Sequence, residues 1–230
     1  MKQLIKYVAN SVLGPEWFLT LSAVWRIHRH YEPHYQMFLD MIPERGTMLD
    51  VGANMGVTCA IAKRNRPDIN LIAFEPVPQN LTILHRIQSI YSVRKMTIHP
   101  FAIGDSEGVI SIAVPSANGV PITGLSHVIS SEFKNQDVER HPFAKVDVSM
   151  RTLDSLSLER VDAIKIDVED YEYHVVNGAK QLLQTFQPIV FCELWDTPNR
   201  RKTIDFMTSM GYSVTQKGII DFLFIPLGTA

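Results

Sequence analysis

The sequence predicts an α/β fold in which a mostly parallel sheet carries helices on both faces. From residue 47 onward, short apolar segments alternate with segments in which apolar residues recur at helical spacing. Parallel strands joined by crossover helices produce this alternation. Near the end of the chain, 212–215 and 222–225 indicate a closing hairpin, which would add one antiparallel strand to the sheet.

The elements follow in order along the chain. Core strands are short apolar runs bounded by turn residues, at 47–51, 70–74, 96–102, 163–167 and 188–193. Helices are expected at 57–63, 78–91, 175–186 and 203–210. Two alternating segments, 109–114 and 144–148, indicate an antiparallel insertion. The stretch between them is rich in Ser, Gly, Pro and Asn, which predicts a loop and a candidate lid.

Residues 1–43 are predicted to be a helical addition to this domain, broken near Gly14–Pro15 and again near Pro33. We expect its main apolar face to pack on the domain. A helix lying in a membrane interface is the alternative. The large apolar residues that can share this face are Trp17, Phe18, Leu21 and Trp25.

Composition narrows the class of protein. A chain of 230 residues, with 46% hydrophobic and 20% charged residues, is typical of a soluble globular protein with one sizeable core. The formal net charge of -2 argues against a nucleic-acid partner. Cys59 and Cys192 lack metal-like spacing and fit a reducing compartment, so we expect a cytoplasmic protein. No apolar run is long enough to span a bilayer, and the oligomeric state stays open.

Polar residues gather where the predicted strands end, which is the edge at which α/β sheets bind ligands. Glu75 ends the second strand and is placed to accept both hydroxyls of a ribose. Ile103, at the end of the third, is placed to pack on an adenine face, with Asp105 or a nearby backbone amide at the edge of the base. Each feature alone also fits a turn or a helix cap. The combination predicts a ligand that contains a nucleoside.

The loop after the first strand indicates which nucleoside ligand to expect. Gly52 and Gly56 let the backbone turn tightly and approach a ligand. A dinucleotide requires G-x-G-x-x-G spacing, but Asn54 takes the place of the second glycine and Asp50 would repel a phosphate. An acidic loop suits a cofactor that has an ammonium group and no phosphate, so we expect S-adenosyl-L-methionine. The residues predicted to bind it are Asp50, Gly52, Asn54, Gly56, Glu75, Ala102, Ile103, Asp105 and Asp167.

From about residue 44 to 225 the sequence resembles the FkbM-type methyltransferases in six ordered blocks. The blocks are 48–56 (MLDVGANMG), 73–76 (AFEP), 102–105 (AIGD), 151–154 (RTLD), 164–169 (IKIDVE) and 191–193 (FCE). The resemblance implies a class I, Rossmann-like methyltransferase domain, which we place at 44–230. It also implies O-methylation of a hydroxyl on a sugar, glycan or polyketide-type natural product, so the expected partner is a small-molecule or glycan substrate.

One position departs from the family pattern, which reads Asp-Val-Glu-Gly-x-Glu after the fourth strand. Asp170 stands in the place of that glycine. Aspartate tolerates the left-handed region of backbone conformation. It is also a strong N-cap for the helix that begins near Tyr171, and we predict the capping role.

Asp167 and Glu169 are the predicted catalytic carboxylates. A hydroxyl acceptor must lose its proton as the new bond forms, and these side chains are best placed to take it. The alternative is that they only orient the loop and cap the helix. A divalent Mg²⁺ or Mn²⁺ held by both, with Glu193 as a third ligand, would lower the hydroxyl pKa instead, but the sequence does not establish a metal. An NAD-type oxidoreductase and a non-catalytic cofactor-binding module are the other functions open to this fold.

Overall fold

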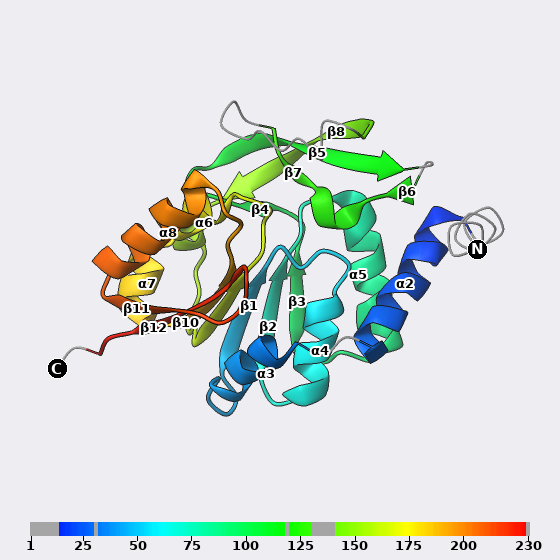
Figure 1. Cartoon of the computed structure of the whole chain (residues 1–230). Helices are drawn as coiled ribbons and strands as arrows, with labels where there is room; N and C mark the ends of the chain where they lie inside the picture. Colours follow the sequence, from blue (N-terminus) through cyan, green and yellow to red (C-terminus); the bar gives the residue numbers. More distant parts are fainter. Residues whose placement is uncertain (1–13, 30–31, 118–119, 130–140, 229–230) are drawn as a thin grey trace.

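The computed structural model describes residues 14–29, 32–117, 120–129 and 141–228. Within these ranges the main sheet has seven strands in the order β11-β12-β10-β9-β1-β2-β3 (Figure 1). The parallel strands are β1 (Thr47–Val51), β2 (Asn70–Phe74), β3 (Met96–His99), β9 (Ala163–Ile166) and β10 (Ile189–Glu193). The hairpin of β11 (Tyr212–Gln216) and β12 (Asp221–Pro226) adds the antiparallel strand beside β10. The predicted fold class is confirmed.

Helices cover both faces of the sheet (Figure 1). A separate hydrophobic cluster joins the sheet to the helices on each face. One face carries α2 (Pro15–Arg29), α3 (Pro33–Asp40), α4 (Val57–Asn65) and α5 (Pro78–Ile90). The other carries α6 (Glu172–Asn177), α7 (Lys180–Phe186) and α8 (Pro198–Ser209). The helix predicted at 175–186 is two helices, because α6 ends at Asn177 and Gly178 is its C-cap. A Cβ on Gly178 would lie 2.0 Å from the carbonyl oxygen of Gly104, so glycine alone permits this contact.

An antiparallel arm lies across the carboxyl ends of the central strands (Figure 1). It pairs β5 (Gly108–Ala117) with β8 (Phe143–Arg151), which confirms the predicted insertion. Its smaller parts are β4 (Ala102–Ile103), β6 (Val120–Pro121), the 3-10 helix η1 (Thr123–Leu125) and β7 (His127–Val128), and a second 3-10 helix, η2 (Leu153–Ser155), follows β8. Residues 118–119 and 130–140 of the predicted lid lie outside the described part of the chain.

The single strand predicted at 96–102 is wrong. β3 ends at His99, and β4 leaves the main sheet to pair with β8 in the arm. Pro100 separates the two strands. Proline has no N–H to continue a ladder of hydrogen bonds, which explains a break at this point.

The N-terminal helices begin at the two prolines where breaks were predicted: α2 begins at Pro15 and α3 at Pro33. Tyr35 and Phe38 of α3 pack on Phe191 of β10, with ring centroids 5.9 and 5.5 Å apart. The face predicted to cover the domain is only partly buried. Its residues Trp17, Leu21 and Trp25 are exposed, and the core contact of α2 is made by Leu19, Ala23 and Ile27. Among the described residues, no helix has the length and apolar character required to cross a membrane.

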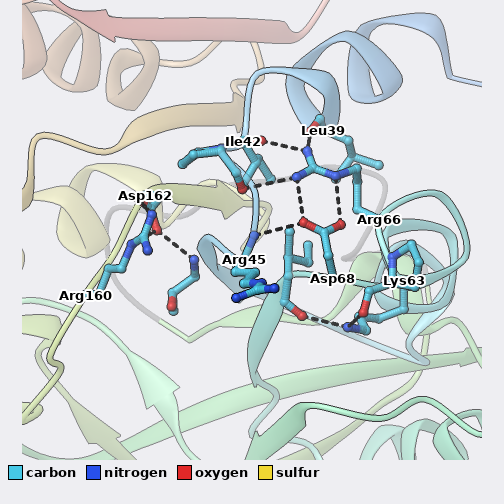
Figure 2. A network of polar contacts seen from close by, with 12 residues as sticks. Leu39, Ile42, Arg45, Lys63, Arg66, Asp68, Arg160 and Asp162 are labelled. Carbon is cyan, nitrogen blue, oxygen red and sulfur yellow. Dashed lines mark hydrogen bonds and ion pairs between the residues drawn. The ribbon is translucent and has the colours of Figure 1, made fainter.

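A polar network fastens this segment to the sheet (Figure 2). The Arg66 guanidinium donates to the carbonyls of Leu39 and Ile42, each at 2.7 Å, so it caps the end of α3. The same guanidinium binds Asp68, which also accepts the Arg45 N–H at 2.9 Å. These hydrogen bonds hold the pKa of Asp68 well below its usual range. The N-terminal helices are thus part of one packed unit with the sheet.

Candidate active site

A cavity of about 300 Å³ lies at the carboxyl ends of β1, β2 and β9, beneath the arm. This is the edge at which an α/β sheet of this kind binds ligands. Most of the residues predicted for the site line the cavity: Gly52, Asn54, Glu75, Ala102, Ile103, Asp167 and Glu169. Three do not, and their positions are described below: Asp50, Gly56 and Asp105.

The glycine-bearing loop lies tightly against the end of β9. Gly52 has φ 85°, and a Cβ there would lie 1.9 Å from the carbonyl oxygen of Asp167. Gly56 also has a left-handed φ, of 80°, but it lies outside the cavity lining, at the start of α4. A Cβ on Gly56 would meet Leu84 at 2.4 Å, so its role is helix packing. Gly52 is the glycine that shapes the cavity.

Glu75 holds the loop and the end of β2 together. Its carboxylate accepts the backbone N–H of Asn54 at 2.8 Å, the N–H of Val77 at 2.9 Å and the side-chain amide of Asn80 at 3.1 Å. The side chain is 4% exposed, and this burial raises its pKa to about 7 against the opposing effect of the hydrogen bonds. A buried carboxylate that lines the cavity beside backbone amides is suited to binding hydroxyl groups.

Asp50 lies behind the cavity wall, which corrects the prediction that it faces the ligand. Side chains alternate along a strand, and Leu49 and Val51 of β1 belong to the cluster on the opposite face. Asp50 therefore points toward α4, where it is fully buried and accepts hydrogen bonds from Thr58 Oγ1 at 2.8 Å and Cys59 Sγ at 3.1 Å. Asp50 therefore acts on the site indirectly, through its charge interaction with Lys165.

Lys165 is a site residue that the predictions omitted. It is in register with Asp50 on the neighbouring strand, is 2% exposed, and lines the cavity floor. Its Nζ lies 3.1 Å from Asp167 Oδ2 and 3.6 Å from Asp50 Oδ1. Burial lowers the pKa of Lys165, but the charges of Asp167, Asp50 and Glu193 outweigh it and raise the pKa above its usual value. The sequence signal is a lysine inside the apolar strand 163–166.

The chain after β9 places further carboxyl groups around this ammonium. Glu169 lines the cavity with φ 53°, and burial, followed by the charges of Asp167 and Glu172, raises its pKa to about 9. Glu193, at the end of β10, also lines the cavity, and burial and the charge of Asp167 raise its pKa. Both carboxyl groups therefore hold their protons more readily than exposed glutamates do. In the described residues, no group of three metal-ligating side chains is arranged to hold a metal ion.

Glu172 holds the turn after β9 in place through hydrogen bonds. It is 1% exposed, and its carboxylate accepts the N–H groups of Val168 at 3.1 Å and Asp170 at 3.3 Å. Burial raises its pKa to about 8, although the hydrogen bond from the Val168 N–H lowers it. Because both amides belong to the turn that carries Glu169, Glu172 fixes the position of that side chain.

The prediction that Asp170 caps α6 is wrong. The helix begins at Glu172, and its N-cap, Tyr171, makes no capping hydrogen bond. Asp170 adopts φ 71°, so it does occupy the left-handed region in which the family has glycine. Its carboxylate accepts a short hydrogen bond from the Thr197 hydroxyl, and its carbonyl accepts one from Asn199 at 2.8 Å. Asp170 joins the turn after β9 to the start of α8.

Asp105 is also placed differently from the prediction that it reads the edge of an adenine. It lies outside the cavity lining, and its carboxylate contacts His174 Nδ1 at 2.8 Å. His174 belongs to α6 and stacks on Tyr171, with ring centroids 4.2 Å apart. Asp105 therefore anchors α6, and only Ala102 and Ile103 of the third block reach the cavity.

Two distant segments complete the cavity. The first belongs to the stretch predicted as a lid, although none of its residues was named for the site, and the second was not predicted. The arm contributes Ser126 and His127, and the N-terminal segment contributes Arg26 and Glu32. Ser126 Oγ is buried and has no hydrogen-bond partner among the described residues, so it is free to bind a ligand. These contacts depend on long-range packing and leave no local motif in the sequence.

The fold is that of a class I, Rossmann-like methyltransferase domain. The chain matches the family model described as "Methyltransferase FkbM domain" over residues 50–214, and it belongs to that family. The resemblance seen in the sequence is thereby confirmed.

Three similar proteins illustrate the range of the family and fold. The chain is 24% identical to "Methyltransferase 1" of Beauveria bassiana over 63% of this chain and 65% of that protein. It is 25% identical to "Methyltransferase sdnD" of Sordaria araneosa over 76% of each. The crystal structure of "Methyltransferase FkbM" from Methylobacillus flagellatus has a TM-score of 0.52 at 14% identity, covering 90% of this chain and 59% of that one. This chain thus spans less than two thirds of the first relative and of the crystal structure.

Proposed function

We propose that this protein is an S-adenosyl-L-methionine-dependent O-methyltransferase whose acceptor is a hydroxyl group of a sugar, glycan or polyketide-type natural product. The observation that carries the proposal is that two kinds of group line one cavity. Glu75 offers a buried carboxylate beside the Gly52 loop, and Asp167 and Glu169 offer further carboxyl groups. The expected substrate is a small molecule or glycan.

The residues present fit the cofactor. Glu75 is a buried acceptor at the position where a ribose would lie, and Ala102 and Ile103 give an apolar surface for the base. Gly52 and Asn54 line the cavity beside them. When bound, the cofactor supplies a methyl group on a sulfonium, which is electrophilic without further activation.

The task of the protein is then to orient the acceptor oxygen and to accept its proton. Orientation alone supplies roughly 7–11 kcal/mol in well-organised sites. Glu169 is the proposed proton acceptor, because its raised pKa of about 9 makes its ionised form a strong base. Asp167 is held by Lys165 at 3.1 Å and is the proposed orienting group. Turnover should rise with pH as Glu169 ionises.

Calorimetric titration of the full chain with S-adenosyl-L-methionine and, separately, NAD⁺ tests the cofactor assignment. We expect binding of the first only, and Glu75→Ala should weaken it at least tenfold, since charge-assisted hydrogen bonds are worth roughly 1.5–3 kcal/mol. Glu16→Ala is the matched control, because this acid lies on α2 outside the cavity lining. Binding of NAD⁺, or unchanged affinity in a folded Glu75→Ala, would overturn the assignment.

The chemistry is tested by comparing Asp167→Asn and Glu169→Gln with the unaltered protein on a panel of hydroxyl compounds. Methyl transfer, measured by mass spectrometry of the product, should fall by roughly 10²-fold or more, the usual scale for a positioned base. Cofactor affinity should stay within a few-fold. Normal turnover in both variants would show that these carboxyl groups are structural. Tight cofactor binding without transfer to any acceptor would favour a non-catalytic module.

A further inference from the structure

Helix α2 carries a row of large apolar side chains on its outer face. Trp17, Leu21 and Trp25 are spaced four residues apart, so they lie one above the other on the helix surface. Their exposed fractions are 53%, 52% and 62%. We call these three residues the tryptophan row. The inner face of α2 is already satisfied by contact with the core, so folding does not account for the outer row.

The charges around the tryptophan row are mainly positive. Arg26 and Arg29 are exposed in the last turn of α2 and form no ion pair with any described residue. The acid of the first turn, Glu16, is neutralised by Arg86 at 2.6 Å. The Arg86 guanidinium also lies 4.8 Å from the centroid of the Trp17 ring. In the sequence, 1–13 adds Lys2 and Lys6 and contains no acid.

These side chains match one kind of surface. Tryptophan has an apolar body and a polar N–H, which favours the boundary between lipid headgroups and acyl chains. Arginine can keep its charge at the headgroups while its stem lies on apolar groups. A helix with an apolar outer row, basic flanks and modest total hydrophobicity binds in the plane of an anionic membrane surface. A purely apolar protein partner would not require the arginines.

The cavity reaches the helix that carries the tryptophan row. Arg26 lines the cavity and follows Trp25 directly in the same helix. We propose that the tryptophan row, with Arg26 and Arg29, docks this protein on an anionic lipid surface and places the cavity rim beside it. The occupant is a bilayer that contains anionic phospholipid. The proposal does not depend on which molecule accepts the methyl group.

Flotation of the full chain with vesicles tests the docking. Vesicles of phosphatidylcholine mixed with phosphatidylserine should carry the protein, vesicles of phosphatidylcholine alone should carry much less, and added salt should weaken binding. Trp17→Ser combined with Trp25→Ser should reduce binding roughly tenfold or more, as the buried apolar area is lost. Ile219→Ser is the matched control, because Ile219 is 86% exposed in the loop between β11 and β12. Arg29→Gln should weaken binding to the mixed vesicles only.

A second readout does not depend on substitution within the row. In a Trp195→Phe background, the fluorescence of Trp17 and Trp25 should shift to the blue and be quenched by bromine-labelled lipid only in anionic vesicles. Absence of flotation with either vesicle, or undiminished flotation of the double variant, would overturn the proposal. A concentration-dependent dimer that the double variant loses would assign the row to a second copy and overturn it as well.

Discussion

Replacing Lys165 with methionine tests the charge arrangement beneath the cavity. Methionine keeps the length of the side chain and removes the ammonium that lies 3.1 Å from Asp167 and 3.6 Å from Asp50. Asp50 is 0% exposed, so neighbouring side chains and not bulk solvent compensate its charge. Removing one partner of a buried ion pair costs about 3–5 kcal/mol. Against a total stability of about 5–15 kcal/mol, such a loss is easily measured.

The assay is urea unfolding of four proteins: the unaltered chain, Lys165→Met, Asp50→Asn and the double variant. In the double variant the neutral asparagine no longer needs a counter-ion, so it should be less destabilised than the sum of the two single changes. Arg160→Met is the control, since Arg160 lies 2.7 Å from Asp162 but is 51% exposed. An exposed pair of this kind is worth at most about 1 kcal/mol.

Two results would refute the reasoning. The first is a loss below about 1 kcal/mol in Lys165→Met, which would mean that Asp50 and Asp167 do not need the ammonium. The second is strict additivity in the double variant, which would mean that Lys165 and Asp50 are not coupled. In either case Lys165 would be a packing residue and not the counter-ion of the site.

The remaining predictions concern four positions. Methyl transfer should rise with pH toward 9 as Glu169 loses its proton, and Glu169→Gln should abolish this dependence; a flat profile in the unaltered enzyme would remove Glu169 as the base. Between the ordinary pKa of Glu172, 4.5, and its raised value of about 8, the folded state binds more protons than the unfolded state, so stability falls as pH rises. Glu172→Gln should make that fall less steep in melting curves. Gly52→Ala should cost roughly 3 kcal/mol or more in urea unfolding, whereas Gly124→Ala, with open space around it, should cost little. Asp170→Ala should cost about 1–2 kcal/mol through strain and a lost hydrogen bond, and Asp170→Gly less; equal losses would exclude a strained backbone.

The sequence was sufficient to predict the layers of the fold because its periodicity is local. The strands at 47–51 and 70–74 have the predicted bounds, and the insertion and closing hairpin are present. Errors arose where one residue overrides the pattern. Pro100 ends β3 early, and Gly178 divides the helix predicted at 175–186. Helix α8 starts at Pro198, before the apolar residues that suggested 203.

Site prediction was limited by side-chain direction and by long-range contacts. The strand ends located Glu75 and Asp167 on the cavity. Asp50 lies near the end of β1, at the same edge of the sheet, but its side chain points toward α4. Lys165 belongs to the block 164–169 that resembles the family. Its role as counter-ion of Asp50 follows only from the register of β1 and β9. Arg26 reaches the cavity from α2, which no pattern links to it, and Ser126 lies in the predicted lid but was not itself named for the site.

The position of β1 has a consequence for synthesis of the chain on the ribosome. β1 lies between β2, which is made next, and β9, which is made only after the whole arm. Until β9 emerges, one edge of β1 has no partner strand, and Asp50 lacks the ammonium of Lys165. A nascent chain that ends within the arm therefore carries both an open strand edge and an uncompensated acid, which disfavour a stable half-sheet. We expect the central sheet to become stable in one late step, when β9 pairs with β1 and places the Lys165 ammonium beside Asp50.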